Sequence, residues 1–507
     1  MFAKIYHTKT PFAVLAVIVI LLSNCKMQSN YKSPTLTKQK SWSSNNLLPK
    51  DNTVPSRKKW WLELHDEAIN NLIAQTLNNN PTLDQALSRV DEARAILGVN
   101  KADYYPSFTA IANTTKNHTT LDSKTNSSST TKGQIIGNST TSIVKPALAW
   151  EIDLFGRIRS SVDAAQKHLD ARSADAEYTK LILAAQVAKT VIDLRACNYI
   201  SAIYLKDVNS RQKTFALIQQ KTIAGFSSPV DQASSLRDLE AAKIILAEQN
   251  EICEQNINAL IYLSGSNKEK ITKLLGKKNA YKNKLYRYNY KSEDFIPELK
   301  ETYLRLPASI LTMHPSVVAA NLDAEAAWNN IGVAKAERLP KIDLSAAFTK
   351  EWLGIAGSTI RSTSWAFGPN FAATLFDAGK GSSNVKAAKA QYQEAAAKLQ
   401  DTIRATIKEI ENALSAQKSA DERLISAKKS LIAAKIAFNA ATQEWKKGSF
   451  SLLELEDANR QYNIAENNFI NAKRDRAKAW VEIINATANS IKLNQTYIYE
   501  KPSIPKI

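Results

Sequence analysis

Two short segments of the sequence carry side chains whose types and spacing could do chemistry. Ser451 is followed three residues later by Glu454, and Ser228 is followed three residues later by Asp231. A serine oxygen that accepts from the amides of a first helical turn, with an acidic residue at the third helical position, marks the start of a helix. Glu454 and Asp457 are one helical step apart, so their carboxylates share a face. Capping alone would account for both segments, and the shared face of Glu454 and Asp457 places two carboxylates side by side in the second one.

Catalytic and metal-binding chemistry finds no support elsewhere in the sequence. The five histidines are scattered and make neither a metal-ligand spacing nor a catalytic triad. The segment Gly379 to Ser382 lacks the upstream glycine and the hydroxyl residue directly after lysine that a phosphate-binding loop needs. With three methionines, the chain also has no methionine ladder for soft metals. We therefore predict no enzyme activity, no cofactor and no metal.

The sequence is duplicated, so each half is expected to be one structural unit. Pro81 and Pro106 lie 25 residues apart, and Pro315 and Pro340 repeat that spacing (106−81 and 340−315). The predicted divisions of the chain are a signal peptide at 1–24, an extended and lipidated segment at 25–62, a first repeat at 63–265, a basic linker at 266–300, a second repeat at 301–489 and a tail at 490–507.

Each repeat is predicted to contain a β-hairpin, because the hydrophobic period changes from that of a helix to that of a strand. Ile342, Leu344, Ala346 and Phe348 alternate with residues of the opposite face. Strict alternation of this kind is typical of strands with one apolar side. The hairpins are placed at 107–155, with a loop at 114–132, and at 341–376, with a shorter loop at 354–361.

Each repeat also contains two long helices that are predicted to form an antiparallel coiled hairpin. No proline or glycine interrupts residues 162–223, which would make a helix of about 90 Å at about 1.5 Å per residue. Apolar residues recur at alternating three- and four-residue steps here and on the helix that returns from Pro229, as in a heptad seam. Gly225 marks the tip of this hairpin, and Gly448, 223 residues later (448−225), marks the tip of its copy. The coiled hairpins are placed at 160–263 and 383–489.

Two of the cysteines lie in the seams of the first coiled hairpin. Residue 225 is the midpoint between Cys197 and Cys253, so antiparallel helices place these two residues level with each other. An oxidising compartment allows a disulfide between them, and two buried thiols are the alternative. The second repeat has Ala420 and Arg476 at the matching positions, so a bridge would brace one hairpin only.

Four strands per chain cannot close a barrel, and open strand edges are not stable in lipid. A soluble sheet packed on the helices is one solution. Membrane strands that close by oligomerisation are the other, and the aromatic residues on the apolar side of the hairpins favour it. Three copies would supply twelve strands. The predicted fold class is mainly α with transmembrane β strands.

The N-terminal residues have the features of an export signal. Two lysines precede the apolar run at 11–22, which is too short to span a bilayer. The run ends in Leu22-Ser23-Asn24-Cys25, which resembles a bacterial lipobox and so implies diacylation of Cys25. By the same resemblance, Lys26 in place of aspartate implies sorting to the outer membrane. Ordinary secretion, with a signal that is uncleaved or cut elsewhere, is the alternative.

The net charge of +19 indicates a basic surface suited to anionic lipid, lipopolysaccharide or nucleic acid. The most basic segment, residues 268–291, matches no nucleic-acid recognition module. We therefore predict a solvated linker or an extra subdomain in this segment, and no nucleic-acid partner.

The order of these features, twice over, resembles the TolC-like outer-membrane efflux proteins, and most closely their lipoprotein (NodT-type) branch. The resemblance extends from Trp60 to Asn489 and includes the Trp60-Trp61 entry, the Asn80-Pro81 and His314-Pro315 helix starts, and the segment Trp150 to Arg157. It implies a homotrimer with a twelve-stranded β-barrel in the lipid of the outer membrane and an α-helical tunnel across the periplasm. It also implies two protein partners, a periplasmic adaptor (a membrane fusion protein) and an inner-membrane pump of the resistance-nodulation-division type.

The resemblance assigns roles to both hairpin tips. Acidic residues at the positions of Glu454 and Asp457 ring the tunnel mouth in this family, so a trimer would place six carboxylates there. Phe450 stands where some members carry a basic residue that locks the closed mouth. Adaptor docking is implied for the turns that contain Gly225, Ser228, Asp231, Gly448 and Ser451.

The function implied is that of a passive exit duct for small molecules that a pump delivers. A duct for type I protein secretion is a second possibility. A coiled-coil envelope lipoprotein without a channel is a third, although such a spacer has no use for two aromatic-faced hairpins.

Overall fold

The computed structural model describes residues 31–32, 59–122, 134–275, 296–297, 310–355 and 358–488. The predicted signal peptide, Cys25, most of the segment 25–62, most of the basic linker and the tail 490–507 lie outside these residues. The chain divides into two compact units. One includes 90–171 and 320–399, and the other includes 36–89, 172–319 and 400–507.

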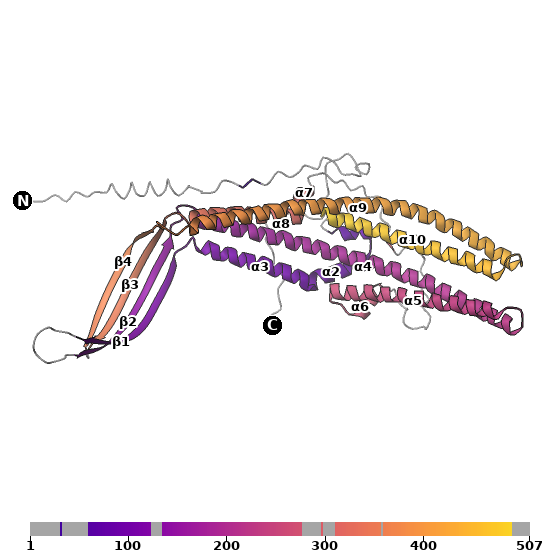
Figure 1. Cartoon of the computed structure of the whole chain (residues 1–507), viewed down its shortest axis with the longest axis horizontal. Helices are drawn as coiled ribbons and strands as arrows, with labels where there is room; N and C mark the ends of the chain where they lie inside the picture. Colours follow the sequence, from indigo (N-terminus) through magenta and orange to yellow (C-terminus); the bar gives the residue numbers. More distant parts are fainter. Residues whose placement is uncertain are drawn as a thin grey trace, which may run out of the picture. The chain divides into compact units, whose positions relative to one another are not determined.

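The first unit contains an antiparallel sheet whose four strands lie side by side in the order β1-β2-β3-β4 (Figure 1). These strands are β1 (Ser107–Asp122), β2 (Gln134–Glu151), β3 (Lys341–Ile355) and β4 (Ser358–Ala372). Strands β1 and β4 are the edges of this sheet, and their outer backbone groups have no partner strand among the described residues.

The strands are longer than the sequence pattern predicts. The first part of the loop expected at 114–132 is strand, since β1 runs to Asp122, and β3 and β4 extend into the loop expected at 354–361. Pairing depends on backbone groups, and threonine suits a strand as well as an apolar residue does. Thr114 lies opposite Ser142, and their hydroxyl oxygens are 3.0 Å apart. The loop prediction was wrong at 114–122, 354–355 and 358–361, because polar side chains do not prevent pairing.

Long helices make up most of the remainder, which confirms the mainly α fold class. In each 67-residue helix, α4 and α9, the rise of about 1.5 Å per residue gives a length of about 100 Å. The helices among the described residues are all too short or too polar to cross a bilayer. The long helices are α3 (Pro81–Ala102), α4 (Arg157–Ile223), α5 (Pro229–Ser264), α8 (Pro315–Ala336), α9 (Lys380–Lys446) and α10 (Leu452–Thr487). The short ones are η2 (Trp60–Leu64), α2 (Glu67–Asn79), α6 (Lys268–Leu275) and α7 (Ile310–Met313).

The core of the second unit forms where η2 and α2 pack among the long helices. Trp60 of η2 is buried, and its ring lies 5.9 Å from that of Trp480 on α10. Asp66 caps α2 by accepting from the amides of Ala68 and Ile69, and it forms an ion pair with Arg195 of α4. The segment between residues 60 and 79 is therefore fastened by apolar packing and by a buried charge.

The helix starts at Asn80 and His314 differ in chemistry although they match in sequence. The Asn80 amide donates to the carbonyl of Leu263 at 2.8 Å. His314 is buried, as Asn80 is, but its Nδ1 lies 2.7 Å from the Ser316 hydroxyl and its ring makes a T-shaped contact with Tyr178 of α4. Burial lowers the pKa of His314 to about 4.

We expect His314 to make the protein less stable in mild acid. In the unfolded chain the imidazole has a pKa of about 6.5, so it is protonated below that pH. In the folded protein it is protonated only below about pH 4. The stability is complete above pH 6.5 and falls by about 3 kcal/mol as the pH is lowered to 4. Urea unfolding at several pH values should show this slope, and His314→Asn, which copies Asn80, should flatten it. The same slope in both proteins would contradict the assignment.

Candidate functional site at the helical hairpin tips

The first hairpin tip joins α4 to α5 through a left-handed glycine. Gly225 has φ +79°, and the Phe226 amide donates to the carbonyl of Lys221 at 2.7 Å. This arrangement satisfies carbonyls that the end of α4 would otherwise leave free. A side chain at position 225 would be strained at this φ, so the turn requires glycine.

The second tip joins α9 to α10 in the same way. Gly448 has φ +82°, and the Ser449 amide donates to the carbonyl of Glu444 at 2.9 Å. The two turns are therefore built on the same plan, 223 residues apart (448−225).

Both predicted capping boxes are present at the starts of α5 and α10. The Ser228 hydroxyl accepts from the Asp231 amide at 3.1 Å, and the Asp231 carboxylate accepts from the Ser228 amide at 3.1 Å. Ser451 and Glu454 exchange the same bonds at 3.2 and 2.7 Å. Hydrogen bonds from these serines lower the pKa of Asp231 and of Glu454, so both carboxylates stay ionised to a lower pH than an ordinary acidic side chain.

An open groove of about 650 Å³ lies beside the second tip, between α9 and α10. Glu454 and Asp457 both line it, as their shared face predicts. Arg460 lines it as well, and its guanidinium nitrogen lies 3.3 Å from the Asp457 carboxylate. Arg460 was not among the residues predicted from the sequence, although its three-residue spacing from Asp457 was a signal. The groove therefore carries charge of both signs.

The same groove has an apolar lining. Leu453 is 76% exposed, and Phe450, Ala434, Ala437 and Ala458 complete the apolar part of the wall. Exposed apolar side chains that gather next to charged ones mark a surface for binding another protein.

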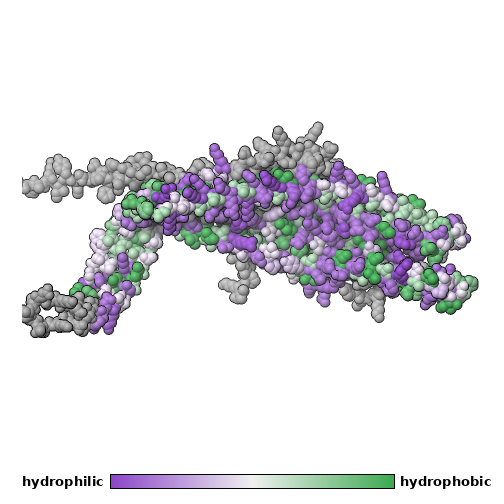
Figure 2. Space-filling model, in the orientation of Figure 1, coloured by the Kyte–Doolittle hydropathy of each residue, from purple (hydrophilic) through white to green (hydrophobic). Residues whose placement is uncertain are grey.

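The first tip is similar, because Ile223, Phe226 and Val230 are all largely exposed. Figure 2 shows hydrophobic and hydrophilic patches side by side at the hairpin tips. Both tips can therefore offer apolar side chains to a partner.

A polar strip joins the two hairpins of one chain along α4 and α10, and the sequence analysis did not identify it. Asparagine recurs at every fourth position from Asn459 to Asn471, which was the available signal. Hydrogen bonds of this kind contribute about 1 kcal/mol each, because water can replace either partner. The pairs are Tyr199 with Glu466, Tyr204 with Asn467, Asp207 with Asn463, Ser210 with Asn459 and Glu456, and Thr214 with Glu456.

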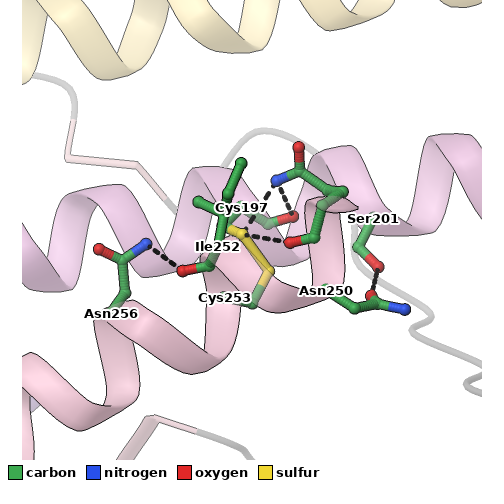
Figure 3. Close-up of a disulfide and its surroundings, with 7 residues drawn as sticks. Cys197, Ser201, Asn250, Ile252, Cys253 and Asn256 are labelled. Atoms are coloured by element: carbon green, nitrogen blue, oxygen red, sulfur yellow. Dashed lines mark hydrogen bonds between the residues drawn. A yellow bond between two sulfur atoms is a disulfide. The ribbon is translucent and has the colours of Figure 1, made fainter. Parts of the chain in front are cut away.

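The two cysteines of the first hairpin are bonded in the structure (Figure 3). Cys197 of α4 and Cys253 of α5 have Cα atoms 5.6 Å apart, as level positions on antiparallel helices require. The Gln249 side chain donates to the carbonyl of Cys197 at 3.4 Å, and Ser201 donates to Asn250 at 2.6 Å one turn closer to the tip. Within the described part of the chain, no three His, Cys, Asp or Glu side chains are grouped as a metal site would require.

Comparison with known proteins gives consistent matches over most of the chain. Residues 72–266 and 306–489 match the family described as outer membrane efflux protein. The chain is 25% identical to outer membrane protein OprJ of Pseudomonas aeruginosa, over 94% of this chain and 96% of that protein. It is 26% identical to nodulation protein T of Rhizobium leguminosarum bv. viciae, over 92% and 91%. The crystal structure of the Campylobacter jejuni CmeC outer membrane channel has a TM-score of 0.79 at 23% identity and covers 93% of this chain and 96% of its own.

Proposed function

The chain belongs to the outer membrane efflux protein family, and we infer that it is the outer-membrane channel component of an efflux system. The single observation that carries this inference is the sheet, which has one exposed apolar face and two open edges and continues into paired long helices. A spacer lipoprotein would have no use for such a sheet. The channel would be a passive duct, because energy for transport would come from another protein.

The open edges of the sheet support a homotrimer. Unpaired backbone groups on β1 and β4 cannot remain exposed in lipid. Three copies of the four-stranded sheet would close a twelve-stranded barrel, with the long helices forming a tunnel below it. Diacylation of Cys25 would add a lipid anchor in the same outer membrane.

The hairpin tips are proposed to bind the periplasmic adaptor and so to reach an inner-membrane pump of the resistance-nodulation-division type. The docking turns would be those containing Gly225, Ser228, Asp231, Gly448 and Ser451. Exposed Phe226 and Leu453 beside these turns support this role. Small molecules are the proposed cargo.

Glu454 and Asp457 are proposed to control ion passage at the mouth, and their neutralisation tests the function. In planar bilayers the purified protein should form cation-preferring pores. Glu454→Gln with Asp457→Asn should lower the K⁺ to Cl⁻ permeability ratio by about tenfold, since a ring of fixed charge concentrates counter-ions by at least about that factor. Asp457→Asn alone should have the larger single effect, because it also releases Arg460.

Asp231→Asn is the matched control, because it removes the equivalent carboxylate at the first tip. Its permeability ratio should stay that of the unmodified protein. Unchanged conductance and selectivity in the double variant would eliminate the carboxylate ring. A complete lack of pores from a correctly folded trimer would instead argue against the channel itself.

A further inference from the structure

Strand register sorts the side chains of the sheet onto two faces. Ile342, Leu344, Ala346 and Phe348 of β3 share one face, which we call the aromatic face. Across β4, Ala346 pairs with Phe367 and Phe348 pairs with Trp365. Trp365 is 78% exposed, so this face is apolar and open to its surroundings.

The aromatic face from Ile342 to Trp352 has the height of a membrane. These two residues of β3 are ten residues apart (352−342), or about 34 Å at about 3.4 Å per residue, and Lys350 is the one charged residue that β3 places on this face between them. Strands tilted by about 40° would give a band about 26 Å tall, close to the roughly 25 Å of known membrane barrels. Trp352 lies where an interfacial aromatic residue belongs, at the end of the sheet away from the helices.

Three basic residues occupy the aromatic face at that same end. Arg361 pairs with Trp352 across β4, and Lys350 lies two residues before Trp352 on β3. Lys116 of β1 pairs with Thr140, which pairs in turn with Gly354. By strand spacing, Lys350 and Arg361 start about 8 Å apart, two residues along and one strand across. All three basic residues are exposed.

Three of the four acidic residues in the described strands lie on the face opposite these basic residues. Glu151, Asp343 and Glu351 fall on that opposite face by register. Asp122, at the end of β1 and six residues beyond Lys116 (122−116), shares the aromatic face. Lys350 places its Nζ 5.4 Å from the centre of the Trp352 ring, so its side chain leans toward Trp352, at the end of the aromatic face. A lysine that leans this way at the edge of an apolar surface places its charge at the level of lipid headgroups. Figure 2 shows the sheet changing from pale and green to purple toward this end.

We propose that Lys116, Lys350 and Arg361, together with Trp352, form a binding belt for the phosphate groups of the outer-leaflet glycolipid, lipopolysaccharide. The proposal rests on the proposed function, because helices in the periplasm orient the far end of the sheet toward the outer leaflet. Arginine and lysine bind phosphate through charge-assisted hydrogen bonds, and the tryptophan ring packs against the sugar and acyl region. Lys116 and Arg361 lie on the two edge strands, so barrel closure brings them onto neighbouring strands of adjacent copies.

Titration of the detergent-purified trimer with fluorescent lipopolysaccharide tests the belt. Each basic residue near a lipid surface contributes about fivefold in affinity, so the variant K116Q/K350Q/R361Q should bind about 100-fold more weakly. K145Q/K341Q is the matched control, because both lysines lie on the opposite face of the same sheet and its affinity should be unchanged. The charge-keeping variant K350R/R361K should bind like the unmodified protein, which separates loss of charge from misfolding.

Three outcomes would overturn the belt. These are equal affinity in the triple variant and the unmodified protein, an equal loss in K145Q/K341Q, and equal affinity for phosphatidylglycerol and lipopolysaccharide. Pore formation measured on the same preparations keeps the two proposals apart. If the triple variant loses its affinity for lipopolysaccharide but still forms pores, the belt is supported. If the unmodified protein forms normal pores but does not bind lipopolysaccharide, the belt is contradicted and the channel function is not.

Discussion

Replacing Trp60 with alanine is expected to lower the free energy of unfolding by about 3–5 kcal/mol. Trp60 is 1% exposed, and its ring packs against Trp61 at 5.8 Å and Trp480 at 5.9 Å. Alanine would leave a cavity where η2 meets α10, and the long helices around it cannot collapse into the space. The transition should be measured by urea unfolding in detergent, followed by circular dichroism of the helices.

Leu62→Ala is the matched control on the same short helix. Leu62 is 49% exposed, so its loss should change the stability by no more than about 0.5 kcal/mol. Trp60→Phe should lie between the two, since it keeps part of the ring volume. Equal free energies of unfolding for Trp60→Ala and Leu62→Ala would mean that Trp60 of η2 contributes little to the stability of the core.

Removing both cysteines of the first hairpin, as Cys197→Ser with Cys253→Ser, is expected to lower the unfolding free energy by about 4 kcal/mol. The disulfide closes a loop between positions 56 apart in sequence, and a loop of that length restricts the unfolded chain strongly. Reductant should destabilise the unmodified protein by the same amount and leave the double variant unchanged. Non-reducing gels should show faster migration of the unmodified protein alone.

The second hairpin supplies the internal comparison for this prediction. It carries Ala420 and Arg476 at the positions that match the cysteines, and Arg476 pairs with Asp421. Ala420 is buried, and its methyl group can form no covalent bond to the facing helix. Labelling of both Cys197 and Cys253 by an alkylating reagent after denaturation, without reductant, would show that the thiols are free and would contradict the prediction.

Local patterns allowed much of the fold to be read from the sequence. The two-residue alternation at Ile342 to Phe348 indicated strands, and the Ser228 and Ser451 segments indicated helix starts. Both depend on residues close together in the chain. The exact strand ends were missed, because β1 continues through a threonine-rich stretch that resembles a loop.

The groove and the polar strip could be predicted only in part. Glu454 and Asp457 were recognised from their spacing on one helix. The α9 residues that complete the groove, Ala434 and Ala437, come from the other helix of the hairpin. The strip pairs Tyr204 with Asn467, which are 263 residues apart, and no local pattern specifies such a pair.

By itself, the sequence determined the duplication, the helical and strand periods, the capped tips and the level placement of Cys197 and Cys253, because each follows from short-range spacing or from symmetry about a turn. The tertiary structure alone decided that Lys116, Lys350 and Arg361 meet at one end of the same face, and which residues of α4 contact α10. These outcomes depend on register between distant segments, where a shift of one residue moves a strand side chain to the opposite face. Backbone pairing and packing set that register, and they involve the whole sheet or bundle at once.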